Sequence, residues 1–136
     1  MKRLFFVCLF VAMFYSCSKS TTNNNALSGK WNIVTDAKFI GLGQDNQQVN
    51  YVGKLDDYFD FLNDSVIYMK EGSVLDTLNY KRTSNTTIII SSFGVIANGE
   101  PETSQMSNHT NRGLTITAAN IYTPGGTFGR KIVLSR

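Results

Sequence analysis

The chain is poor in the residues that build disulfides, metal sites and acid–base chemistry: its 136 residues include two cysteines and one histidine. Cys8 and Cys17 both lie near the N-terminus, so the rest of the chain has no thiol for a disulfide framework or a metal cluster. His109 stands in a polar stretch without a Cys, Asp or Glu at ligand spacing, which favours a solvated loop side chain over a zinc ligand or a catalytic base. We expect neither a metal nor a cofactor.

Motifs of enzymes and of nucleic-acid binders are also absent. The sequence has no Gly-x-Ser-x-Gly elbow for a nucleophilic serine and no glycine-rich phosphate loop. It has no Lys/Arg cluster with interleaved aromatic residues, which argues against a nucleic-acid partner. The densest set of carboxylates is Asp56, Asp57, Asp60 and Asp64. Asp56, Asp60 and Asp64 share one strand parity, opposite the phenylalanine face, so we expect an outward, solvated edge rather than a calcium site there. The protein is therefore expected not to be an enzyme.

What the sequence does contain, first, is an export signal that ends at Cys17. Two basic residues precede an apolar run at residues 4–15, which suits the core of a signal peptide and is too short to span a bilayer. The next residues resemble the lipobox of bacterial lipoprotein precursors, with Phe where a Leu is usual: Phe14-Tyr15-Ser16-Cys17. This resemblance implies cleavage before Cys17, lipidation of its sulfur, palmitate among the acyl chains, and a membrane-anchored location in the cell envelope, at the outer membrane.

Three segments follow from this interpretation. Residues 1–16 are expected to be the lipoprotein signal peptide, 17–26 a flexible tether, and 27–136 a single domain. The tether is expected because residues 18–25 contain no apolar side chain that would offset the entropy of ordering. Removal of the signal peptide also removes two basic residues from a formal net charge of +3, so the remainder is nearly neutral.

From Leu27 onward, short runs of β-branched and aromatic residues alternate with Gly, Asn, Asp and Ser, and no apolar period of 3.6 residues persists. This pattern is typical of an all-β domain. We expect seven to nine strands in up-and-down order, with residues 41–50 as a polar loop and 98–112 as a long polar loop with room for one weak strand. The clearest strands are expected at residues 31–40, 55–62, 66–70, 74–82, 86–92, 114–118 and 131–136, and 93–97 continues or starts another.

Alternation along these strands predicts which side chains point inward. Twelve are expected in the interior: Trp31, Ile33, Phe59, Phe61, Leu78, Tyr80, Ile88, Ile90, Leu114, Ile116, Ile132 and Leu134.

The two ends of the domain resemble a known family. Leu27-Ser28-Gly29-Lys30-Trp31 is similar to the Gly-x-Trp opening of lipocalins and of bacterial lipocalin-like lipoproteins. The last strand, which ends in Leu134-Ser135-Arg136, resembles their closing strand. The resemblance implies an antiparallel up-and-down β-barrel of about eight strands, closed by Gly29, Trp31 and Arg136, with the guanidinium stacked on the indole. The Thr-Asp-Tyr motif of animal lipocalins is absent, so the resemblance does not imply that this chain binds the ligands of animal lipocalins.

A barrel of about eight strands holds either a packed interior or one small ligand. In the first case the inward aromatic residues are core. In the second case Phe59, Phe61 and Tyr80 line a cavity for a small apolar or amphipathic molecule. The leading hypothesis is therefore ligand capture in the envelope. The alternative is a structural or interaction subunit with a filled barrel, which contacts a protein or glycan through the loops 41–50 and 98–112.

Two triplets resemble an O-glycosylation acceptor pattern of exported bacterial proteins, in which Asp precedes Ser or Thr and a small or apolar residue follows. They are Asp64-Ser65-Val66 and Asp76-Thr77-Leu78. The pattern implies modification of Ser65 and Thr77 on the outer face of the domain.

Overall fold

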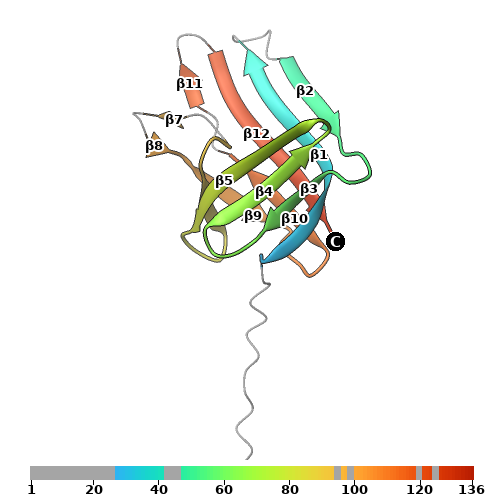
Figure 1. Cartoon of the computed structure of the whole chain (residues 1–136). Helices are drawn as coiled ribbons and strands as arrows, with labels where there is room; N and C mark the ends of the chain where they lie inside the picture. The colour runs from blue at the N-terminus through green and yellow to red at the C-terminus, as the bar shows by residue number, and fades with distance from the viewer. Residues whose placement is uncertain (1–26, 42–46, 94–95, 98–99, 119–120, 124–125) are drawn as a thin grey trace, which may run out of the picture.

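The computed structural model describes residues 27–41, 47–93, 96–97, 100–118, 121–123 and 126–136 (Figure 1). This part of the chain consists of strands and turns, and it has no helix long and apolar enough to cross a membrane. The strands are β1 (Gly29–Gly41), β2 (Gln47–Val52), β3 (Tyr58–Phe61), β4 (Val66–Glu71), β5 (Val74–Arg82), β6 (Thr87–Ile90), β7 (Ile96–Ala97), β8 (Glu100–Pro101), β9 (Thr103–Ser107), β10 (Gly113–Thr117), β11 (Ile121–Thr123) and β12 (Gly126–Ser135).

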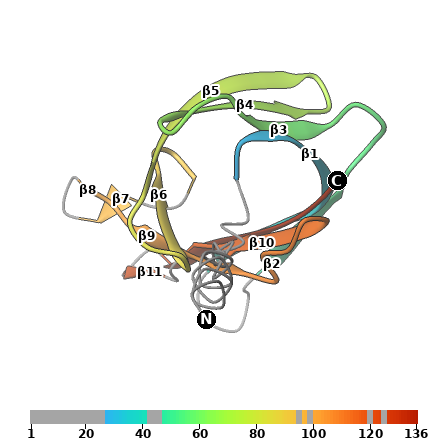
Figure 2. The same ribbon diagram turned by 90° about the horizontal axis from the view of Figure 1, so that it is seen from below.

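Eight of these strands close into an antiparallel barrel. The order around the ring is β1-β3-β4-β5-β6-β9-β10-β12, and β12 pairs back onto β1. Figure 2 shows this ring from below. The expected all-β, up-and-down, lipocalin-like barrel is therefore confirmed. Closure leaves the ring itself without a free sheet edge, which removes the aggregation hazard of open sheets.

The seam between β1 and β12 extends beyond the ring. One edge of β1 serves two partners in turn, since residues 29–32 pair with β3 and residues 35–40 pair with β2. In the same way β12 pairs with β10 near its end and with β11 near its start. The upper parts of β1 and β12, with β2 and β11 beside them, thus form an extension above the barrel (Figure 1).

Three expected segments are corrected by the structure. The prediction of a loop at residues 41–50 is wrong for residues 47–50, which belong to β2. The strand at 55–62 is reduced to β3, because a turn precedes it in which Asp56 has a φ of 77°. The long loop at 98–112, in which at most one weak strand is expected, contains β9, which is a full member of the barrel. The sequence signal of β9 is weak because its inward side chains are only Ser104 and Met106, too few for an apolar alternation.

The lower barrel is filled with apolar side chains, which we call the apolar floor. All twelve expected inward residues are buried, together with Leu27, Ile67, Met69, Phe93, Met106 and Ala118. Aromatic rings interlock within it: Phe61 meets Tyr80 edge to face at 5.2 Å between centroids, and Phe59 meets Phe93 at 6.3 Å. Each large side chain buried in this way contributes about 1.5–3 kcal/mol of transfer free energy.

The lower end of the barrel is closed around Trp31. Its Nε1 donates a hydrogen bond to the Leu27 carbonyl at 2.8 Å, and the guanidinium carbon of Arg136 lies 3.9 Å from the ring centroid. Arg136 also donates to the carbonyls of Leu27 and Ser28. Gly29 permits this arrangement because its φ of 103° is one that L side chains rarely adopt.

His109 belongs to the same end. Its ring centroid lies 6.4 Å from that of Trp31 and the side chain is half-buried, so the expectation of a solvated loop histidine is wrong. Burial lowers the pKa of His109, and the positive charges of Arg82 and Arg136 lower it further.

Candidate binding site inside the barrel

A β-bulge in β1 turns a carboxylate into the barrel. Ile33 pairs with Leu134 and Thr35 with Val133, so Val34 is an extra residue without a partner on β12. A bulge shifts the alternation of inward and outward side chains by one residue. Asp36 therefore points inward and is fully buried, at 0% exposure, whereas strict alternation from Trp31 and Ile33 would place it outside.

The loop between β2 and β3 is fitted against this bulge. Gly53 donates its N–H to the Val34 carbonyl at 3.0 Å, and a Cβ at Gly53 would lie 1.7 Å from the Ile33 carbonyl oxygen. Only glycine allows the two backbones to approach so closely. The break between β2 and β3 and the bulge in β1 are thus parts of one local structure.

Asp57 anchors the same loop. Its carboxylate accepts hydrogen bonds from the Tyr51 hydroxyl at 2.6 Å and from the N–H groups of Lys54 and Gly72. Burial alone would raise the pKa of Asp57, but these three hydrogen bonds lower it; in turn Asp57 raises the pKa of Tyr51 to about 12. Asp57, which has the parity of the inward phenylalanines, is buried, whereas Asp56 and Asp64 of the expected outward edge are exposed and Asp60 is half-buried.

Arg130 is the buried partner of Asp36. It lies on β12, where register pairs it with Lys38, and its Nε donates to both carboxylate oxygens of Asp36 at 3.0 Å. One Nη of Arg130 also binds Asp36. The guanidinium carbon is 4.6 Å from the Phe93 ring centroid, and Nη2 is 3.6 Å from the Met69 sulfur. Arg130 therefore lies directly on the apolar floor.

Two further charged residues complete what we call the charged layer, namely Asp36, Lys38, Glu71 and Arg130. The Lys38 ammonium is 3.0 Å from Oε1 of Glu71 and 3.8 Å from Oδ2 of Asp36. Nη2 of Arg130 is 3.6 Å from Oε2 of Glu71. Side-chain exposure rises across the layer from 0% for Asp36, through 10% for Arg130 and 12% for Glu71, to 39% for Lys38. Solvent therefore reaches the layer at Lys38.

The pKa values of the two carboxyl groups in the layer are shifted in opposite directions. Burial raises the pKa of Glu71, and the neighbouring Asp36 carboxyl raises it further, against the effect of Lys38. Burial would also raise the pKa of Asp36, but the hydrogen bonds of Arg130 and Glu71 and the charges of Arg130 and Lys38 lower it. Oε2 of Glu71 is buried and has no hydrogen-bond partner among the described residues. The pair titrates as a unit, with Glu71 as its proton acceptor.

The residues chosen from sequence lie elsewhere. Phe59 and Phe61 are fully buried in the apolar floor. Tyr80 is 7% exposed, lines a hollow of about 340 Å³ at the lower end, and donates its hydroxyl hydrogen to the Asn63 carbonyl. The structure does not bring these three together with the charged layer, and cavity lining by them stays a prediction.

The other predicted site residues are placed as follows. Ser65 is exposed in a turn, where its hydroxyl donates to Asn63 Oδ1 at 2.9 Å, and Thr77 is exposed on β5. Cys17 lies outside the described residues. Gly29, Trp31 and Arg136 meet at the lower end. In the described part of the chain, no group of three or more His, Cys, Asp or Glu side chains is placed to hold a metal ion.

Part of the charged layer carried a signal in the sequence. Glu71 has the parity of Ile67 and Met69, and Arg130 has the parity of Ile132 and Leu134, so one more residue on each expected strand would have placed both inside. Asp36 carried no such signal, because nothing in the sequence marks the bulge at Val34.

No protein-family model matches the chain, and no curated protein or solved structure is significantly similar to it. The class of protein is therefore defined by the fold and the site together. It is an all-β, lipocalin-like barrel of eight strands whose interior is apolar below and charged above.

Proposed function

We propose that the protein is a lipid-anchored binding protein of the cell envelope, without enzymatic activity, whose barrel takes a small amphipathic ligand at the charged layer. The carrying observation is that four charged side chains are retained inside a barrel whose other described inward residues are mostly apolar. Removing an ion from water costs several kcal/mol, and well-packed apolar side chains often serve stability as well as a buried ion pair. Clusters with perturbed pKa values are characteristic of functional sites.

The charges of the layer favour an anionic head group. The layer holds two cations, Lys38 and Arg130, against the carboxyl groups of Asp36 and Glu71. Because the pKa of Glu71 is raised and that of Asp36 is lowered, a proton taken up by the pair goes to Glu71 and shifts the layer toward positive charge. Lys38 is the most exposed member and already contacts Glu71 Oε1. A ligand carboxylate would replace Glu71 at the Lys38 ammonium, and the raised pKa of Glu71 favours proton uptake by the displaced carboxyl. The apolar part of the ligand remains outside the filled floor, along the upper part of the barrel.

The anchor and the charged layer would lie at opposite ends of the domain. Strand β1 begins at the lower end of the barrel in Figure 1, and Asp36 and Lys38 follow further up the same strand. A tether ending at Leu27 would thus hold the lower end toward the membrane. Cys17→Ser is expected to block lipid transfer and leave unprocessed precursor, and normal maturation to a soluble form would contradict the anchor.

The test uses the full chain purified from membranes in detergent. Native mass spectrometry is expected to show a lipid-sized adduct, and 11-(dansylamino)undecanoic acid is expected to bind with enhanced fluorescence. Lys38→Met is expected to weaken binding of this probe by about tenfold, which is about 1.4 kcal/mol. The matched control is Lys131→Met, because Lys131 is exposed on β12 next to Arg130. Equal affinity for Lys38→Met and the parent protein would refute the site.

A second candidate function is an interaction subunit with a filled barrel. It is supported by the dense apolar floor and by large apolar side chains exposed near the β4–β5 turn and the loop before β3, such as Leu55 at 94% and Leu75 at 72%. Absence of any adduct and of probe binding would favour this candidate.

A further inference from the structure

The outer face of β3, β4 and β5 carries a second, separate surface. Cross-strand register aligns its outward side chains in two adjacent rows. The first row consists of Lys30, Asp60, Tyr68 and Thr77, and the second of Asn32, Tyr58, Lys70 and Leu75. Since Tyr68 and Tyr58 stand in neighbouring rows on neighbouring strands, the two rings are diagonal neighbours on one face.

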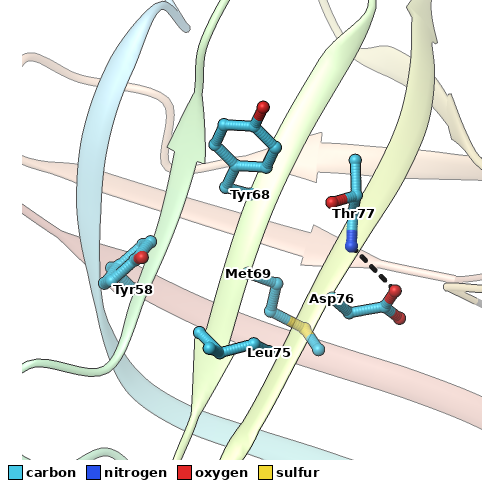
Figure 3. A pocket seen from close by; sticks show the side chains of 6 residues that line it. All are labelled: Tyr58, Tyr68, Met69, Leu75, Asp76 and Thr77. Atoms are coloured by element: carbon cyan, nitrogen blue, oxygen red, sulfur yellow. Dashed lines mark hydrogen bonds between the residues drawn. The ribbon is translucent and has the colours of Figure 1, made fainter.

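The two rows border a hollow of about 440 Å³, lined by Tyr58, Tyr68, Met69, Leu75, Asp76 and Thr77 (Figure 3). This volume falls within the range of about 300–1,000 Å³ that is usual for small-molecule sites. Tyr68 is 43% exposed, whereas Met69, which also lines the hollow, is buried in the apolar floor of the barrel. Asp76 lies at the rim, where its Oδ1 accepts the Thr77 N–H.

The two tyrosines have different surroundings. The Lys30 ammonium lies 4.1 Å from the centroid of the Tyr58 ring, so one face of that ring is occupied by a cation–π contact. For Tyr68 no ring or cation contact is found among the described residues, and its ring is accessible. Tyr68 therefore offers the stacking surface, and Tyr58 forms a fixed wall beside it.

The charges around the hollow are balanced. Lys30 and Lys70 are matched by Asp60 and Asp76, so a polyanion such as nucleic acid or an anionic lipid surface finds no excess of positive charge there. Hydroxyl, carboxylate and ammonium groups next to an accessible aromatic ring suit a ligand with an apolar C–H face and a rim of hydroxyl groups. That combination describes a sugar ring.

We infer that the outer face of β3–β5 binds a neutral oligosaccharide, with one sugar stacked on Tyr68 and its hydroxyl groups directed to Asp76 and Thr77. Tyr68 and Thr77 lie on the opposite face of the sheet from the charged layer, since they alternate with the inward residues Ile67 and Leu78 of the same strands. Two other lining residues, Met69 and Asp76, pair across the strands at the inward parity, and Met69 is the residue that the hollow shares with the surroundings of Arg130. An envelope protein would thus bind a glycan on its outer wall.

The test is calorimetric titration of the full chain in detergent with maltohexaose, cellohexaose and chitohexaose. Binding of at least one at millimolar affinity or better is expected. Tyr68→Ala is expected to weaken it by about tenfold or more, and Tyr68→Phe, which keeps the ring, to retain it. Leu62→Ala is the matched control, since Leu62 is 51% exposed at the end of β3 and outside the hollow.

A second variant guards against misfolding of Tyr68→Ala. Thr77→Arg fills the hollow from an exposed position and is also expected to abolish binding while leaving the thermal unfolding temperature unchanged. Binding of none of the three oligosaccharides, full affinity in a folded Tyr68→Ala or Thr77→Arg protein, or displacement by heparin would each overturn the inference. The dansyl probe for the charged layer is expected to bind all these variants equally, so the two sites are tested separately.

Discussion

The lower and upper halves of this barrel are built from the same strands but use opposite chemistry. Below, Trp31, Phe61 and Ile132 are fully buried in an interior that excludes charge. Above, the same strands place Asp36 and Arg130 inside, and β4, which supplies Ile67 to the floor, supplies Glu71 to the charged layer. The contrast shows that different layers of one barrel interior are stabilised by different interactions. Packing stabilises the floor, whereas the charged layer is stable only while its charges remain paired.

The largest effect is expected from the floor. Trp31→Ala should lower the free energy of unfolding by about 3–5 kcal/mol, because it leaves a cavity that the surrounding strands fill only partly. Arg136→Ala should cost less, and much of its effect should vanish in the Trp31→Ala background, since the two side chains touch. Urea denaturation of the two single variants and the double variant measures this coupling. Additive effects would show that the stacked pair does not close the barrel as a unit.

The next effect is expected in the charged layer. Asp36→Asn should destabilise by about 3 kcal/mol, because the buried Arg130 loses its counter-ion. The double variant Asp36→Leu/Arg130→Met should recover most of this loss, since a matched apolar pair leaves no unpaired buried charge and Glu71 keeps Lys38 as its partner. Chemical denaturation at neutral pH distinguishes the two. Equal instability of the double and the single variant would show that the stability of the charged layer depends on side-chain shape, as in the apolar floor, rather than on charge pairing.

The same contrast explains what could be predicted from sequence. In the floor, alternation from Trp31 along β1 and from Leu134 along β12 was sufficient, and every expected inward residue is buried. In the upper half alternation fails at Val34, because a bulge depends on the partner strand and on the close approach of Gly53, both of which are tertiary features. Strand β9 was expected at most as a weak strand in a polar loop for a similar reason: its pairing with β6 and β10, not its composition, makes it a strand of the barrel.

A smaller effect is expected from Glu71→Gln, which sharpens the charge argument. The amide keeps an oxygen that can accept from Lys38 and cannot ionise beside Asp36, so stability at neutral pH should stay within about 1 kcal/mol of the parent protein. The pKa of Glu71 is raised in the folded protein. Its contribution to the stability of the fold is therefore fully present below the ordinary pKa of 4.5 and is lost as pH rises through the pKa in the folded protein. Asp36 acts in the opposite sense, since its contribution to stability is lost as pH falls below 3.8.

Glu71→Gln should remove only the decline of stability on the alkaline side. Urea denaturation across this pH range measures it, with Glu102→Gln as the exposed control. An unchanged alkaline decline would show that Glu71 is not the proton acceptor of the pair.

The smallest effect is expected back at the lower end, where His109 lies against the Trp31 ring. Its folded pKa is depressed, because burial and the charges of Arg82 and Arg136 disfavour the imidazolium. The contribution of His109 to the stability of the fold is therefore present above the ordinary pKa of 6.5 and is lost as pH falls through the pKa in the folded protein. This pH dependence is opposite in sign to that of Glu71. His109→Gln should remove this acid-side decline and leave stability above that range nearly unchanged. The chain has one histidine, so a proton NMR titration of the imidazole assigns the pKa without ambiguity. A titration midpoint at or above 6.5 would mean that proton uptake does not weaken the floor, and that the pH response of the barrel belongs to its charged layer alone.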